Sequence, residues 1–265
     1  MSIHLDALEA QTIYILREAY NRIDNLAMLW SIGKDSTALL WMARKAFFGE
    51  VPFPLVHLDT EMELPEVYDF RDTLQKDWGF TLQSEMCPAE EDMDQSLPPA
   101  TRAAARKTEG LKQLVERENY GGLILGIRRD EQGTRAKERV FSPRSFDGQW
   151  DVKNQPPEFW DHFKTEFAEG THIRVHPLLQ WTEIDIWRYT ARENLPMVPL
   201  YLAKDGKRYR SLGEKNITFP VDSNASTIEE IIEELETTRT SERAGRAMDH
   251  ETEDSFERLR SLGYM

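Results

Sequence analysis

The start of the chain carries apolar side chains at helical spacing. They lie three, four or seven positions apart, or directly side by side: Leu5, Leu8, Ile15, Leu16, Ala19 and Ile23. A stripe of this kind covers one face of a helix that packs against a core. The pattern predicts an amphipathic helix over residues 5–24.

After this helix the hydrophobic pattern changes from helical to strand-like. Short apolar runs at 27–30 and 53–58 are each followed by a polar break and then by helical patterns over 35–48 and 64–78. Further strand-like runs occupy residues 80–83, 122–125 and 173–178. Strands that alternate with helices pair in parallel through right-handed crossovers. The chain is therefore predicted to fold as α/β, with a doubly wound, mostly parallel sheet and helices on both faces.

The last third of the chain contains two helix starts and a basic loop between them. Residues 182–185 have the Thr-x-x-acid spacing of a capped helix, and residues 227–230 form a capping box that opens an acidic helix to about residue 239. Residues 204–225 are rich in Lys, Arg, Gly and Asn and are expected to form a loop. The charged tail 240–265 is expected to lie over the core or to be partly mobile.

Composition and charge limit the classes of function. The net charge of -14 over 265 residues disfavours nonspecific binding to nucleic acid, so an anionic ligand needs a local basic pocket. The single Cys87 cannot form an internal disulfide, and neither zinc spacing nor an iron–sulfur motif is present. Without an apolar run of 18 residues or a secretory signal, we expect a cytoplasmic protein with no membrane span.

The stretch Ser31-Ile-Gly-Lys-Asp-Ser-Thr37 lies where the strand 27–30 ends and the helix 35–48 begins. Open α/β sheets bind ligands at this edge, and the amides of a helix N-terminus attract phosphate. The loop adds hydroxyls, a cation and a flexible glycine. It is not a Walker A loop, because it has one glycine and Asp35 follows the lysine. The candidate phosphate-binding residues are Ser31, Gly33, Lys34, Asp35, Ser36 and Thr37; the alternative is a helix capped by Asp35 or Ser36.

A second polar segment, Gly126–Lys137, follows the strand 122–125 and is expected to project over the same edge of the sheet. Its basic residues are Arg128, Arg129, Arg135 and Lys137. Guanidinium groups present paired donors that suit phosphate or sulfate oxygens. The alternative is a solvated surface on which these charges pair with the neighbouring acidic residues.

Weaker candidates lie at two further places. Asp59 and Thr60 close the strand 53–58, where a carboxylate can accept from the sugar or base of a nucleotide, and a strand-end turn is the alternative. Arg208 and Arg210 form a second basic loop. The histidines on strand-like segments, His57, His172 and His176, are expected to be hydrogen-bonded core or rim residues.

The loop 31–36 resembles the Ser-Gly-Gly-x-Asp-Ser loop of the ATP pyrophosphatases, which split ATP between its α and β phosphates; Ile32 stands where that pattern has glycine. In the form Ser-Ile-Gly-Lys-Asp-Ser, it is similar to the family of small subunits (subunit 2) of bacterial sulfate adenylyltransferase. Further segments resemble that family in the same order: 43–47, 52–60, 107–112, 128–131, 135–139, 181–187, 198–203 and 240–246. The resemblance covers nearly the whole chain. The chain departs from the family in a short connection after Leu202 and in Glu214, where the family has a cysteine.

The resemblance implies an adenine nucleotide alpha hydrolase-like, nucleotide-binding domain over 1–200 and a C-terminal extension over 201–265. It implies that sulfate attacks the α-phosphorus of ATP, with Mg²⁺ on the phosphates, and that a larger GTPase subunit is a partner; a homo-oligomer is a further option. The catalytic residues would be Lys34, Arg128, Arg129, Arg135 and Lys137. The nucleotide-binding residues would be Ser31, Gly33, Asp35, Ser36, Thr37, Asp59, Thr60, Arg208 and Arg210.

Two other functions stay open: adenylylation of a different oxyanion, and a noncatalytic nucleotide-binding subunit. Reduction of adenylyl sulfate, performed by relatives with the same fold, is disfavoured because it needs a nucleophilic cysteine near the C-terminus. Cys87 is the single thiol of the chain and lies far upstream.

Overall fold

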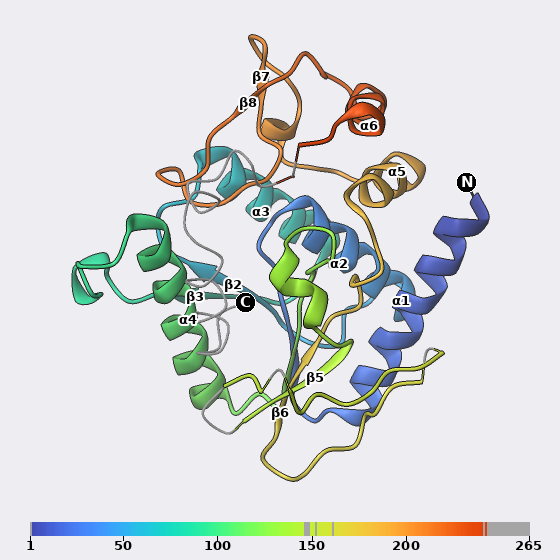
Figure 1. The fold of residues 1–265 in the computed structure, drawn as a ribbon, viewed down its shortest axis with the longest axis vertical. Helices are drawn as coiled ribbons and strands as arrows, with labels where there is room; N and C mark the ends of the chain where they lie inside the picture. The colour runs from blue at the N-terminus through green and yellow to red at the C-terminus, as the bar shows by residue number, and fades with distance from the viewer. Residues whose placement is uncertain (1, 146–148, 152, 161, 241, 243–265) are drawn as a thin grey trace.

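The computed structural model describes residues 2–145, 149–151, 153–160, 162–240 and 242. Six strands of this part form one sheet, in the order β3-β2-β1-β4-β6-β5 (Figure 1). Neighbouring strands run parallel, except that β5 is antiparallel to β6. The strands are β1 Leu26–Leu29, β2 Leu55–Asp59, β3 Leu82–Met86, β4 Gly122–Ile124, β5 Phe141–Arg144 and β6 His172–Val175. The predicted mostly parallel α/β sheet is confirmed.

The strand order reverses at β1, since β2 and β3 extend the sheet to one side while β4 and β6 extend it to the other. Strands β1 and β4 pair in register from Leu26 opposite Gly122 to Met28 opposite Ile124, so they end at the same level. Open α/β sheets bind ligands at such a switch point, beyond the carboxyl ends of the strands. The loops that leave β1 and β4 are therefore placed to share one ligand.

Helices cover both faces of the sheet (Figure 1). They are α1 Ser2–Arg22, α2 Lys34–Ala46, α3 Pro65–Trp78, α4 Pro99–Glu118, α5 Glu183–Glu193 and α6 Ile228–Thr237. Helix α2 packs on α1 and α5, and its Trp41 ring lies 5.4 Å from that of Trp78 in α3. Helix α4 packs on β2 and β3, and the right-handed crossover back to β4 places it on the opposite face. The apolar stripe predicted for the opening helix is buried, as expected.

Strand β5 is the edge of the sheet and was not predicted. It carries Pro143, which lacks an N–H group and is tolerated at an edge. Its outer side is hydrogen-bonded within the chain: the amides of Val140 and Phe141 donate to Glu158, and the side-chain amide of Gln155 donates to the Pro143 carbonyl. The last strand of the sheet is thus closed by side chains.

The segment after residue 200 packs on the rest of the molecule through α6. Capping boxes formed by Thr182 with Asp185 and by Thr227 with Glu230 open α5 and α6, as predicted. Ile231 of α6 is fully buried in the core that the sheet also shares. The expected loop contains a short antiparallel pair, β7 Lys207–Arg208 and β8 Val221–Asp222. Three short 3-10 helices complete the described elements: η1 Glu90–Asp92, η2 Gly133–Lys137 and η3 Pro199–Tyr201. None of the helices in the described ranges is long and apolar enough to cross a bilayer.

Candidate active site

The loop between β1 and α2 makes a sharp turn at the switch point. Ile32 has a φ of 63°, in the left-handed region that a β-branched residue rarely adopts. Gly33 is the N-cap of α2, and no side chain caps the helix. The alternative in which Asp35 or Ser36 caps α2 is therefore wrong. The first turn of the helix faces the loop with its backbone amides, which is the arrangement expected of an anion site.

Polar side chains surround this turn. The Lys34 amide donates to the Tyr201 hydroxyl at 3.0 Å. The hydroxyls of Ser31 and Ser36 lie 3.1 Å apart, and Ser36 donates to the Gly33 carbonyl at 3.2 Å. Thr37 is turned inward, where its hydroxyl accepts from the Trp30 indole at 3.2 Å. Ser31 and Ser36 are therefore available at the site, whereas Thr37 supports the turn from behind.

The loops after β1 and β4 enclose a cavity of about 190 Å³. Gly126 brings them together, because a Cβ atom added to it would lie 3.2 Å from the backbone N and Cα of Ser36. A smaller cavity of about 70 Å³ adjoins the first and shares Leu29, Ser31, Lys107, Leu212 and Gly213 with it. Its other lining residues are Trp30, Val56, His57, Leu58 and Glu63. The site thus has a polar part near α2 and a more apolar part between β1 and β2.

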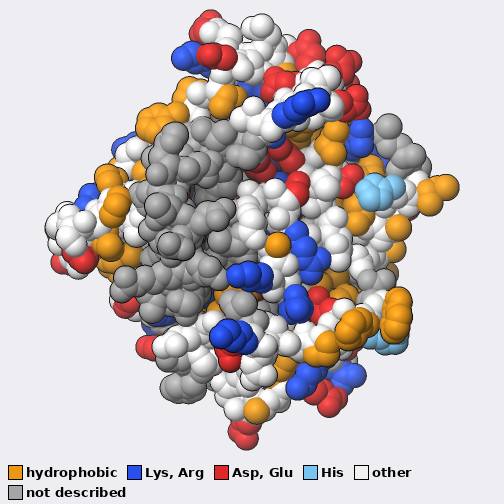
Figure 2. Space-filling model, in the orientation of Figure 1, with side chains coloured by type: hydrophobic (Ala, Val, Ile, Leu, Met, Phe, Trp, Pro, Cys, Tyr) orange, Lys and Arg blue, Asp and Glu red, His pale blue; other side chains and the backbone are white. Residues whose placement is uncertain are grey.

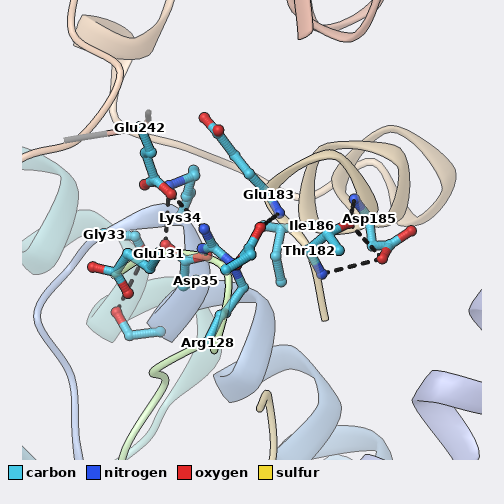
Figure 3. Close-up of polar contacts among 12 residues, drawn as sticks. Gly33, Lys34, Asp35, Arg128, Glu131, Thr182, Glu183, Asp185, Ile186 and Glu242 are labelled. Carbon is cyan, nitrogen blue, oxygen red and sulfur yellow. Dashed lines mark hydrogen bonds and ion pairs between the residues drawn. The ribbon is translucent and has the colours of Figure 1, made fainter. Parts of the chain in front are cut away.

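Two buried cations and three carboxylates meet at the polar end (Figure 3). The guanidinium group of Arg128 pairs with the carboxylates of Asp35 and Glu242, and it donates to Asp130 at 2.9 Å. The Lys34 ammonium lies 3.0 Å from Asp35 and also pairs with Glu242. Burial would raise the pKa of Glu242, but Arg128 and Lys34 outweigh burial and lower that pKa well below its usual range. The ionised carboxylate of Glu242 therefore occupies both cations, Lys34 and Arg128.

The remaining residues of the β4 loop separate into two groups. Arg135 lies in η2, lines the cavity and pairs with Glu131. Lys137 is exposed at the end of η2 and is not among the described residues that line the cavity.

Figure 2 shows Lys and Arg side chains gathered over the light-green segment that contains η2, whereas Asp and Glu side chains crowd around α6. The basic segment is therefore a local feature of an acidic molecule.

The Arg129 side chain leaves the β4 loop in a different direction from that of Arg128, which is fully buried. Its guanidinium group donates to the Glu138 carbonyl at 3.2 Å and lies 3.8 Å from the Glu158 carboxylate. It lines a different cavity, of about 430 Å³, beside α1. The two neighbouring side chains leave the loop in different directions, and their assignment to one ligand stays a prediction.

Four other predicted binding residues are used within the fold. The carboxylate of Asp59 accepts from the Glu61 amide at 2.8 Å and from the Tyr68 hydroxyl at 2.7 Å, which is the strand-end turn given as the alternative. Thr60 is buried beside it. Arg208 pairs with Glu234 of α6 at 2.6 Å, and Arg210 pairs with Glu183 of α5 at 2.7 Å. Asp59, Thr60, Arg208 and Arg210 are absent from the described lining of both cavities.

The lining also contains residues that were not assigned from the sequence, among them Lys107, Tyr201 and Glu242. Each lies in a segment quoted only for its resemblance to the family. Glu242 reaches Arg128 across 114 positions of the chain, so local patterning carries no signal for the contact. Glu214, at the position where the family has a cysteine, is buried 3.7 Å from Lys107.

The thiol and the histidines lie away from the charged end of the site. Cys87 is buried, and burial raises its pKa to about 11, which keeps it in the unreactive thiol form. His172 and His176 bond to the carbonyls of Tyr120 and Arg139 through Nδ1, as expected of core histidines. The buried ring of His57 has no hydrogen-bond partner among the described residues, so the same expectation fails for it.

Comparison with known proteins shows the family of the chain. Residues 25–220 match the model of the phosphoadenosine phosphosulfate reductase domain family. Sulfate adenylyltransferase subunit 2 of Pseudomonas aeruginosa PAO1 is 41% identical over 300 residues, covering 98% of both chains, and that of Pseudoalteromonas translucida is 41% identical over 296 residues with the same coverage. The chain belongs to the phosphoadenosine phosphosulfate reductase domain family and, more narrowly, to the sulfate adenylyltransferase subunit 2 family. The alignments are longer than this chain of 265 residues, so the relatives carry residues that it lacks.

Solved structures share the fold at low sequence identity. A phosphoadenylyl-sulfate reductase from Candida auris matches with a TM-score of 0.55 and 19% identity, covering 83% of this chain and 98% of that one. An FMN adenylyltransferase from Candida glabrata matches with a TM-score of 0.61 and 17% identity, covering 92% and 88%. These likenesses support the adenine nucleotide alpha hydrolase-like fold class.

Proposed function

We propose that this chain transfers the adenylyl group of ATP to sulfate, giving adenylyl sulfate and pyrophosphate. The relatives that are 41% identical over 98% of the chain carry the name sulfate adenylyltransferase subunit 2. The observation that carries the proposal is the meeting of Lys34 and Arg128 at the N-terminus of α2, on the switch point of the sheet. Two buried cations beside the N-terminus of a helix suit a polyphosphate.

The two adjoining cavities suggest how ATP would lie. The apolar part between β1 and β2, lined by Leu29, Val56 and Leu58, suits a flat base. The polar part at Ser31, Lys34 and Ser36 suits the phosphates. This orientation would direct the triphosphate along the start of α2 toward Arg128 and Arg135.

The chemistry asks for positioning and charge stabilisation. An oxygen of sulfate forms a bond to the α-phosphorus while the bond from that phosphorus to the bridging oxygen of pyrophosphate breaks. Sulfate is already deprotonated at neutral pH, so the step needs no general base. Lys34, Arg128 and Arg135 would offset the charge that gathers on the leaving pyrophosphate. Lys137 stays a weaker candidate for binding the acceptor, whereas Arg129 lines a different cavity and is not used in this step.

Magnesium would arrive on the phosphates of ATP, where it neutralises charge. Within the described ranges, no group of three or more His, Cys, Asp or Glu residues is arranged to bind a metal ion. The nucleotide itself, with water, would therefore supply most of its ligands. Asp35 and Glu131 line the cavity, and both already pair with arginines.

The name subunit 2 implies that the relatives work with another subunit. We propose that this chain does the same and that the companion is a larger GTPase, because the anhydride of adenylyl sulfate is less stable than ATP and its synthesis needs coupling. The expected site of the assembly is the cytoplasm. No residue described here is assigned to GTP.

The test is to incubate the purified chain with ATP, magnesium and sulfate, with and without the companion subunit, and to measure pyrophosphate. Release that depends on sulfate supports the proposal. Release that depends on another oxyanion would mean a different acceptor. No release with any acceptor, although ATP binds, would mean a noncatalytic nucleotide-binding subunit.

A further inference from the structure

The cavity that holds Arg129 lies on a different side of the β4 loop from the ATP site. With about 430 Å³ it is the larger of the two. Its lining joins α1, the β4 loop and the segment between β5 and β6. We call the following five residues the arginine–aromatic surface: Arg129, Arg139, Phe159, Trp160 and Phe163.

The aromatic side chains of this surface are unusually exposed for a folded chain. Phe159 and Trp160 have exposed fractions of 62% and 91%, and their rings lie 6.0 Å apart. Trp160 also holds a left-handed backbone with a φ of 48°. Phe163 extends the surface to Tyr14 of α1, at 6.5 Å between rings. In Figure 2, hydrophobic side chains lie exposed over the loop between β5 and β6, beside Lys and Arg side chains. A solvent-exposed tryptophan with a strained backbone does not stabilise the isolated fold, but it is typical of a binding surface.

The charge in the cavity is positive, against the overall charge of -14. Arg139 donates to the carbonyls of Pro156 and Lys137 at 3.1 and 3.3 Å, and among the described residues it forms no ion pair. Arg129 has a carboxylate only at 3.8 Å, that of Glu158. Glu158 in turn is held by the amides of Val140 and Phe141. Glu158 is the one carboxylate among the described residues that line the cavity, and it interacts with both guanidinium groups, so the lining keeps an excess of positive charge.

We propose that the arginine–aromatic surface docks the companion subunit. An acidic side chain of that subunit would enter between Arg129 and Arg139, while Phe159 and Trp160 pack against its apolar residues. Tryptophan, arginine and aromatic residues around a pocket are the composition that dominates binding energy in protein interfaces. A small anion alone would leave the exposed rings uncovered, so the geometry favours a protein.

The position of this surface connects docking to the ATP site. Arg129 follows directly on Arg128, so a partner that holds the Arg129 side chain also fixes the stretch of backbone that carries Arg128. The inference rests on the proposed function, because that function supplies the companion. It adds the face on which the two subunits meet.

The experiment measures binding of the full chain to the purified companion subunit from the source organism by sedimentation velocity. Trp160→Ala and Arg139→Glu are each expected to weaken binding at least tenfold. Phe48→Ala is the matched control for Trp160, because Phe48 is also 91% exposed and lies outside the surface. Arg22→Glu is the charge control, since the Arg22 side chain is 44% exposed on α1.

Equal binding by all variants would overturn the proposal, and so would absence of binding by the wild-type chain. A tryptophan variant that changes only self-association would show that the surface joins two copies of this chain. A loss of sulfate-dependent pyrophosphate release without the companion would show that the surface serves the small-molecule site. The wild-type chain assayed alone for pyrophosphate release tests the proposed function separately.

Discussion

Glu242 places its carboxylate against the ammonium group of Lys34, 208 positions earlier in the chain, at the first turn of α2. The same carboxylate engages Arg128 (Figure 3). A carboxylate held by two cations occupies the donors that a phosphate group of ATP would use. Binding of ATP in the proposed orientation therefore requires Glu242 to move or to share its partners.

Glu242→Gln is expected to tighten ATP binding about tenfold, which corresponds to about 1.4 kcal/mol. The amide keeps the shape of the side chain but removes the charge that competes with phosphate. The measurement is isothermal titration with ATP and magnesium. Glu234→Gln is the control, because Glu234 pairs with Arg208 away from the cavity. If Glu242→Gln binds ATP as well as or more weakly than the wild-type chain, while Glu234→Gln is unchanged, phosphate does not displace the Glu242 carboxylate.

Substitutions of the neighbouring residues Arg128 and Arg129 are expected to affect sulfate-dependent turnover differently. Arg128→Lys keeps a positive charge but loses the planar fork that reaches Asp35 and Glu242, so sulfate-dependent turnover should fall about 100-fold. Arg129→Ala, assayed without the companion, should stay within about threefold of wild type, because its side chain leaves the site. Circular dichroism checks that both variants fold. Equal losses would show that Arg129 reaches the reacting groups.

Gly126→Ala is expected to lower turnover about tenfold and the free energy of unfolding by about 1–2 kcal/mol. The added methyl group would lie 3.2 Å from the backbone of Ser36, so the two loops of the site would have to move apart. Gly133→Ala is the control in the same segment, since a Cβ atom there meets nothing within 4 Å. Similar behaviour of the two variants would mean that the close approach is not needed.

Stability is expected to decrease as the pH falls from about 6.5 to 4. Burial is the main cause that lowers the pKa of His172 and His176 to about 4, from an ordinary value of 6.5. In that window the unfolded chain binds more protons than the folded chain, so the free energy of unfolding falls with pH and levels off below it. Each imidazole contributes up to about 3 kcal/mol.

Urea unfolding at several pH values tests this dependence. His176→Gln should make the curve shallower between pH 6.5 and 4, because a glutamine does not titrate. The exposed His162 provides the control, and His162→Gln should leave the slope unchanged. Identical slopes in all three proteins would remove the buried histidines as the cause.

Cys87→Ala is expected to leave sulfate-dependent turnover within about twofold of wild type. The thiol is buried with a pKa of about 11 and lies outside both parts of the ATP site. A second assay tests for reductase activity: it supplies adenylyl sulfate and a dithiol and measures sulfite. Sulfite production by wild type that Cys87→Ala abolishes would instead establish a reductase.

The sequence predicted the strands that are buried on both faces and missed an edge strand and one long helix. Apolar runs predicted the strands β1, β2, β4 and β6, because both faces of each of these strands contact the core. Strand β5 contains Pro143 and Arg144, which the edge position tolerates. Helix α4 buries only small apolar residues, Ala100, Ala103 and Ala104, in its first half, and its large buried residues Leu111 and Leu114 come late in the helix.

The site was predicted as far as strand order determines it. Loops after β1 and β4 had to meet because parallel strands end at one edge, and Lys34 and Arg128 do meet there through Glu242. The direction of Arg129 could not be predicted, because an irregular loop has no period that assigns side chains to faces. The contacts of Glu242 with Lys34 and Arg128 depend on tertiary packing alone, so no local sequence pattern predicts them.

The closed outer side of β5 restricts how copies of the molecule can assemble. The amide of Phe141 is bonded to Glu158, the carbonyl of Pro143 to Gln155, and Pro143 has no amide hydrogen to offer. A strand from another molecule would find these backbone groups already bonded. Growth of the sheet from one copy to the next through β5 is thereby disfavoured.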